Sequence, residues 1–328
     1  MNPSPDAKAQ HYIPKFYLKG FMDEKKQLWV LEKRKAPRAS RPKEEAHRPD
    51  FYTFTDRGSR DESAEQALCL AENTVAPIIR KLANRNTDLT QEEISALYVF
   101  VAFMFARVPC WRTMLDEKVA ELMRKKTIER AKDKERFHAD FATFVKPHSD
   151  SESVEAEKLR QFILSDKWIV EQKSVGYNLR MMFDSAFAIM EMLAPRGLEI
   201  LVIPANQKAA APEEAVFLTS DSPVFTLAQD NPKVATIGVG FGWSNAQVFM
   251  PLNKRVCLKI SESRIQQKRG FASPKLVKQI NRVLMGTATQ YVYSSRGERR
   301  LARLFDEFGC KVILGKNAFI TSDAVTLG

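Results

Sequence analysis

Two charged side chains stand in apolar stretches of the sequence where they could carry chemistry. Glu72 lies in a helical pattern beside Ala71 and Val75, and a buried carboxylate is costly unless a cation, a metal ion or hydrogen-bond donors accompany it. Arg107 lies near the end of a long apolar segment. The two residues either contribute to a site or simply pair with each other, and a buried ion pair is the favoured interpretation.

A third candidate, Asp221, follows a predicted strand and stands between two serines, ahead of Pro223. Aspartate is an ordinary turn former at such a position. The ends of strands are also where scaffolds of helices and strands commonly present reactive groups. Both interpretations stay open from the sequence.

The helices and strands that must position these residues divide the chain into three parts. The first part, residues 1–60, is predicted to be irregular, with short strands at 27–31 and 51–54 and an exposed loop over 36–49. The second part, residues 61–195, is predicted to be helical because apolar residues recur at helical spacing. Within it Thr90-Gln91-Glu92-Glu93 forms a capping box, and Pro109 should kink or end an apolar helix. Further helices are expected over residues 112–146, 156–165 and 177–193, with a polar linker at 147–154.

The third part, residues 196–328, is predicted to be rich in strands. Helices are expected from Ser273 to about Met285 and over 296–308, the latter basic and amphipathic. A helix-rich first half followed by a strand-rich second half predicts an α+β fold, in which the helices pack with a mixed or antiparallel sheet in one continuous domain. Strands are expected at 198–203, 215–219, 247–250, 255–260, 290–293 and 311–314.

Composition limits the class of protein. The chain has 51 Lys and Arg against 40 Asp and Glu, giving a formal net charge of +11, which would attract nucleic acid, anionic lipid or acidic partners, or serve solubility alone. The four cysteines are far apart, as expected for free thiols in a reducing compartment. Neither a secretory signal nor an apolar run long enough to cross a bilayer is present. We therefore expect a cytoplasmic protein without membrane insertion; the sequence predicts no particular oligomeric state.

The segment from His11 to Phe21, HYIPKFYLKGF, resembles the HYxPxxYLxxF signature that opens the DUF4238 family. Shorter pieces, such as Arg107-Val108-Pro109 and the run from Thr219 to Val224, agree with the pattern of that family along most of the chain. The resemblance brings no established reaction with it. It implies a bacterial-type cytoplasmic protein whose recurring polar residues correspond here to His11, Glu72, Arg107 and Asp221.

These residues lead to the first functional hypothesis. If His11, Glu72 and Asp221 converge, they would bind a divalent metal ion suited to phosphodiester hydrolysis, with Arg107 neutralising the phosphate. We therefore expect a metal-dependent nucleic-acid hydrolase, an accessory or defence factor of its cell. The sequence has no HExxH motif and no HNH cluster. The residues expected to bind nucleic acid are Lys15, Lys19, Arg296, Arg299 and Arg300.

The alternative is a non-enzymatic module that binds nucleic acid or protein. In this interpretation the aromatic residues of the signature and the basic tail grip the partner, while the polar residues pair with one another. His11 would then be a structural histidine whose ring bonds a carbonyl, instead of a base or a metal ligand. The two hypotheses differ in whether the polar residues leave an open coordination position.

Overall fold

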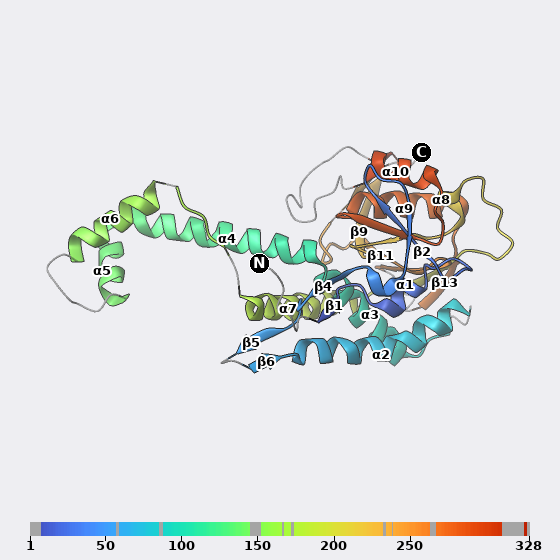
Figure 1. Cartoon of the computed structure of the whole chain (residues 1–328), viewed down its shortest axis with the longest axis horizontal. Helices are drawn as coiled ribbons and strands as arrows, with labels where there is room; N and C mark the ends of the chain where they lie inside the picture. The colour runs from blue at the N-terminus through green and yellow to red at the C-terminus, as the bar shows by residue number, and fades with distance from the viewer. Residues whose placement is uncertain are drawn as a thin grey trace. The chain divides into compact units, whose positions relative to one another are not determined.

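The computed structural model describes residues 8–56, 59–84, 88–144, 152–165, 167–171, 174–231, 234–237, 239–262, 267–309 and 325–326. The chain forms two compact units: unit 1 comprises Met1–Arg112 and Val175–Gly328, and unit 2 comprises Thr113–Ser174. The helical region expected over residues 61–195 is therefore divided between the two units. Helices dominate the first half of the chain and strands the second (Figure 1), so the predicted α+β class is confirmed.

The larger sheet of unit 1 has seven strands in the order β13-β7-β12-β11-β9-β10-β15. Neighbouring strands are antiparallel except β13, which runs parallel to β7 at one edge, so the sheet is mixed. The strands are β7 (Gly197–Val202), β9 (Phe225–Asn231), β10 (Val234–Ile237), β11 (Ala246–Asn253), β12 (Val256–Ser261), β13 (Gln267–Phe271) and β15 (Val325–Thr326).

A second sheet joins the two halves of the chain in the order β3-β2-β14-β8. Its strands are β2 (Leu28–Glu32), β3 (Arg38–Ser40), β8 (Thr219–Ser220) and β14 (Tyr291–Ser294). Two small ribbons pair β1 (Ala9–His11) with β4 (His47–Pro49) and β5 (Phe54–Asp56) with β6 (Ser59–Asp61). The two central strands of the second sheet are the N-terminal strand β2 and the C-terminal strand β14, so this sheet places residues from both halves next to each other.

Several short strands differ from the sequence predictions. Residues 36–49, predicted to be an exposed loop, contain β3, the 3-10 turn η1 (Pro42–Glu44) and β4. Each of these strands has three residues, which is too short for an alternating pattern to show. The predicted strand at 51–54 begins only at its last residue, and the run at 215–219 is α8 (Pro212–Ala215) followed by a coil that reaches β8. The strand expected at 311–314 lies outside the described residues.

The helices of unit 1 largely follow the predictions, because their ends carry local signals. The capping box of α3 is present: Glu93 N donates to Thr90 Oγ1 at 3.3 Å, and Thr90 N donates to Glu93 Oε2 at 2.9 Å. Ser273 caps α9 by accepting from Leu276 N. Figure 1 shows α9 and α10 side by side against the sheets. The helices are α1 (Lys15–Lys19), α2 (Ser63–Ala83), α3 (Gln91–Ala106), α7 (Val175–Leu193), α9 (Pro274–Thr287) and α10 (Arg299–Phe308).

Unit 2 is built by the continuation of α4 (Pro109–Lys132) with α5 (Lys134–Phe144) and α6 (Glu152–Leu164). A small core of Ala131, Phe137 and Ile163 joins them. Within the described ranges no single helix is long and apolar enough to cross a membrane. The helices α3 and α4 satisfy that criterion only when taken together, and they meet at a bend of 62°.

Aromatic residues of the signature lie in the core of unit 1. Tyr17 and Phe21 are fully buried, and Tyr17 Oη lies 2.8 Å from Thr219 Oγ1 and donates to the Pro251 carbonyl at 2.5 Å. The expectation that the aromatic residues of the signature grip a partner is therefore wrong for these two rings, because the protein itself covers them. Their role is to fix α1 against the two sheets.

Candidate functional site: a paired polar cluster and a basic aromatic pocket

Arg107 follows the last residue of α3 and is held inside unit 1. Its side chain is 1% exposed, and its Nη1 donates to Glu72 Oε1 on α2 at 2.8 Å. The Glu72 side chain is 23% exposed. Arg107 Nη2 points at the sulfur of Met104 at 3.3 Å, which is a weak acceptor. The predicted ion pair between Glu72 and Arg107 is confirmed, and it is buried at Arg107 but partly exposed at Glu72.

His11 ends β1 and lies next to His47, with 5.2 Å between the ring centroids. A backbone hydrogen bond with Lys43 holds one ring nitrogen, while Nε2 is buried without a hydrogen-bond partner among the described residues. Burial, with the positive charges of Lys15 and Arg107 and the neighbouring His47 ring, lowers the pKa of His11 to about 4. The imidazole is therefore neutral at physiological pH, and its free nitrogen is an acceptor.

This neutral histidine makes stability depend on pH. The unfolded chain binds a proton at His11 near pH 6.5, whereas the folded chain does so only near pH 4, so falling pH favours the unfolded state across that window. Lowering the pH from 7 to 5 should cost wild type about 1 kcal/mol relative to His11→Asn, after allowance for solvent screening at this half-buried site. Urea unfolding of both proteins at each pH measures the difference. A difference that does not change with pH would contradict this account of His11.

Two further polar residues belong to the same neighbourhood. Tyr52 Oη is buried without a partner among the described residues. Burial raises the pKa of its hydroxyl, and the positive charge of Arg107 opposes that rise. Burial, then the Glu72 charge, raises the pKa of Glu65. Glu65 could have been found from the sequence because it precedes Glu72 by two helical turns and so shares its face. No comparable spacing in the sequence relates Tyr52 to the other polar residues.

Asp221 directly follows β8 and has both carboxylate oxygens occupied. Thr289 N donates to Oδ1 at 2.8 Å, while Gln290 N and Tyr291 N donate to Oδ2 at 2.7 and 3.1 Å. Burial raises the pKa of Asp221 to about 6, and the three backbone amides oppose that rise. Asp221 therefore anchors the connection between α9 and β14, which is a structural role.

The predicted metal site is not formed by the described residues. Among them, no group of three or more His, Cys, Asp and Glu side chains could hold a metal ion. The physical reason is that Glu72 is paired with Arg107 and Asp221 is saturated by backbone amides. His11, Glu72 and Asp221 therefore do not form the metal-binding set proposed from the sequence.

The basic residues expected to bind nucleic acid differ in whether they form ion pairs within the protein. Lys15 and Lys19 are exposed on α1, and Arg299 is exposed on α10. Arg300, in contrast, donates from Nε and Nη2 to the carboxylate of Glu213, which is buried. This pairing gives Arg300 a structural function in holding α10 to α8.

Arg296, the remaining residue of this group, lines a pocket of about 460 Å³ that we call the Trp29 pocket. Two acidic residues, Asp23 and Glu24, contribute to its wall. The pocket combines an aromatic ring with an excess of positive charge, a combination that sequence reasoning missed because its residues come from distant parts of the chain. Its aromatic and basic lining consists of Trp29, Lys25, Lys254, Arg255 and Arg296.

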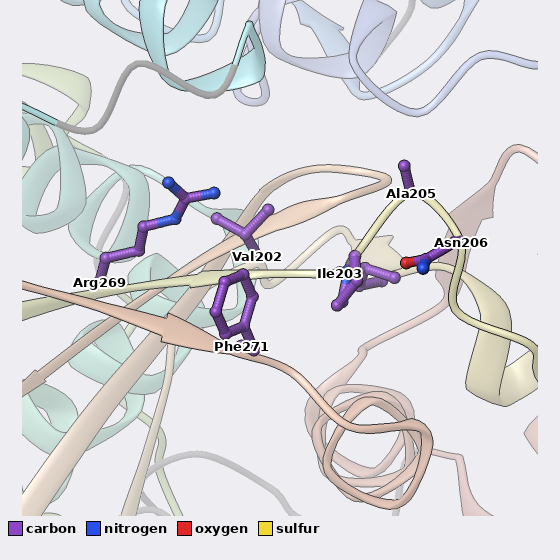
Figure 2. A pocket seen from close by; sticks show the side chains of 7 residues that line it. Val202, Ile203, Ala205, Asn206, Arg269 and Phe271 are labelled. Carbon is purple, nitrogen blue, oxygen red and sulfur yellow. The ribbon is translucent and has the colours of Figure 1, made fainter.

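A second pocket, of about 340 Å³, lies at the end of β7 beside the edge strand β13 (Figure 2). Phe271, 66% exposed, and the aliphatic residues Val202 and Ile203 give it an apolar wall. Arg269 is the one charged group among the described residues that line it, and its guanidinium carbon lies 5.3 Å from the centroid of the Phe271 ring. The lining residues that the structure describes include no carboxylate and no histidine.

Comparison with known proteins identifies the family. A family model described as "Protein of unknown function (DUF4238)" matches residues 9–298. No curated protein and no solved structure gives a significant match. Because the family match spans most of the sequence, including the signature that begins at His11, the chain belongs to the DUF4238 family.

Proposed function

We propose that unit 1 binds nucleic acid. The observation that carries the proposal is the distribution of charge. Residues 113–174 of unit 2 contain 13 Lys and Arg and 13 Asp and Glu, so the whole excess of +11 belongs to unit 1. A net positive charge concentrated in one unit attracts a polyanion, and phosphate contacts by Lys and Arg supply most of the affinity for nucleic acid.

Binding is preferred to metal-dependent hydrolysis because of how the polar residues are engaged. Glu72 pairs with Arg107, as the alternative hypothesis of a binding module predicts, and Asp221 is engaged by backbone amides instead of by another candidate residue. The exposed Lys15 and Lys19 and the Trp29 pocket supply groups for contact with phosphate and base. We assign this function to the cytoplasm, where the free thiols of the described cysteines would persist.

Charge reversal in each unit tests the proposal. Lys15→Glu/Lys19→Glu in unit 1 should weaken binding of a labelled single-stranded RNA about tenfold, because two phosphate contacts are lost. Lys126→Glu/Lys132→Glu in unit 2 changes the net charge equally and should leave affinity nearly unchanged. Fluorescence anisotropy over a range of salt concentrations measures both affinity and salt slope, and circular dichroism checks that each variant is folded.

Three outcomes would overturn the proposal. The first is an equal loss of affinity in both variants, and the second is affinity that does not respond to salt. The third is displacement of the RNA by polyglutamate of matched charge at equal concentration, which would indicate an acidic protein partner. The RNA should also stay intact with Mg²⁺ or Mn²⁺; metal-dependent cleavage that is abolished in a Glu72→Gln variant shown to be folded would restore the hydrolase hypothesis.

A further inference from the structure

The Trp29 ring is held in a fixed orientation in its pocket. Its Nε1 donates to Asp23 Oδ2 at 3.2 Å. Gly297 lies against the ring so closely that an added Cβ would fall 2.3 Å from Cδ2 and Cε3, and only glycine fits there. The ring is therefore positioned before any ligand arrives, which lowers the entropic cost of binding.

The residues beside Trp29 in the second sheet leave room next to the indole. Its register partners are Ala39 on β3 and Ser294 on β14, both small. Ala39 is exposed. No bulky cross-strand side chain covers the ring from these two positions, so the pocket of about 460 Å³ has space for a planar group.

Cationic groups surround this aromatic surface. The Arg296 side chain is 40% exposed, and its Nε donates to Glu298 Oε1 at 2.7 Å. Its two terminal nitrogens have no protein partner among the described residues, so they are available to an oxyanion. Lys254 Nζ donates to the Met22 carbonyl at 3.1 Å, which satisfies one of its three donors and neutralises none of its charge.

The acidic residues of the wall reduce this positive character only in part. Asp23 accepts from Gln27 N on Oδ1 at 2.8 Å and from Trp29 Nε1 on Oδ2, so both of its oxygens are engaged with donors. Glu24 is exposed to solvent. Four basic and two acidic residues line the pocket, and Glu298 pairs with one of the basic residues, Arg296. The balance still leaves positive charge in excess beside the Trp29 ring.

We propose that the Trp29 pocket binds one unstacked nucleotide of a single-stranded nucleic acid, with the base stacked on Trp29 and the phosphate held by Arg296 and Lys254. The inference rests on the proposed nucleic-acid-binding function and specifies its ligand. A base within a duplex is already stacked on its neighbours, whereas a single strand can turn a base into a pocket. Aromatic platforms flanked by basic groups bind single strands in this way.

A comparison of normal and abasic oligonucleotides tests the stacking contact. Wild type should bind a thymidine oligomer about fivefold or more tightly than an abasic oligomer of the same length and charge. Trp29→Leu should abolish that preference and retain phosphate-dependent binding of both. Trp243→Leu is the matched control, because Trp243 is 43% exposed and lies outside the pocket; this variant should keep the preference.

A second variant, at Arg296, tests the phosphate contact and does not depend on whether Trp29→Leu folds. Arg296→Gln should weaken both oligomers by the same factor and reduce the salt slope by about one, because one phosphate contact is lost. Wild type that binds both oligomers equally overturns the nucleotide pocket and leaves the proposed function intact. A Trp29→Leu variant that keeps the full preference also overturns it. Absence of all binding overturns both proposals.

Discussion

Glu72→Gln is expected to lower the free energy of unfolding by about 3 kcal/mol, because it leaves a buried guanidinium without its counter-charge. Arg107 is 1% exposed, and among the described residues its carboxylate partner is Glu72 alone, at 2.8 Å. Arg107→Met should cost less, about 1–2 kcal/mol, since the carboxylate that it leaves behind is 23% exposed and retains part of its hydration. The asymmetry arises from the different burial of the two partners.

Urea unfolding of wild type, the two single variants and the double variant measures these costs. The double variant should be more stable than the sum of the two single losses predicts, because neither charge then remains unpaired. Glu62→Gln is the matched control: Glu62 pairs with Lys8, whose side chain is 65% exposed, and loss of such a surface pair should cost less than about 1 kcal/mol. A larger loss for Arg107→Met than for Glu72→Gln would contradict the argument.

The Glu72 and Arg107 pair could be predicted from sequence because burial constrains charged residues strongly. Apolar neighbours marked both residues as buried, and a buried charge requires a partner. The start of α3 was predictable for a similar reason: the Thr90 and Glu93 capping box is complete within four residues. Features that depend on a few neighbouring residues, or on a strong physical penalty, can be read from one sequence.

The remaining parts of the fold and site depend on contacts between distant residues. The strand β14 pairs with β2 although some 260 residues separate Tyr291 from Glu32. The residue pattern of a strand does not indicate which other strand it pairs with. The Trp29 pocket joins β2 to Lys254 and Arg296 in the same way. The metal hypothesis failed because it also depended on distant contacts. The sequence could not show that the Asp221 carboxylate accepts hydrogen bonds from backbone amides almost 70 residues further along the chain.

Asp221→Ala should also destabilise unit 1 strongly. The substitution removes the acceptor of three backbone amides, those of Thr289, Gln290 and Tyr291. Each buried donor left without a partner costs about 1–3 kcal/mol, and partial access of water to the vacated site reduces the sum, so we expect a loss of about 3–5 kcal/mol. Asp221→Asn keeps one carbonyl acceptor and should lose about half as much. Urea unfolding of both variants measures the two losses.

The same substitution at Asp61 is the control, because it removes one amide contact in an exposed place. Asp61 Oδ1 accepts from Ser63 N at 2.8 Å next to the start of α2, and its loss should cost about 1 kcal/mol or less. Equal costs at Asp61 and Asp221 would mean that water replaces the lost acceptor equally well at both sites, and Asp221 would again be available for another role. A large, graded loss at Asp221 would instead show that its carboxylate holds β14 in register between β2 and β8. That register also places Ser294 beside Trp29, so the structural aspartate and the proposed nucleotide pocket depend on one strand.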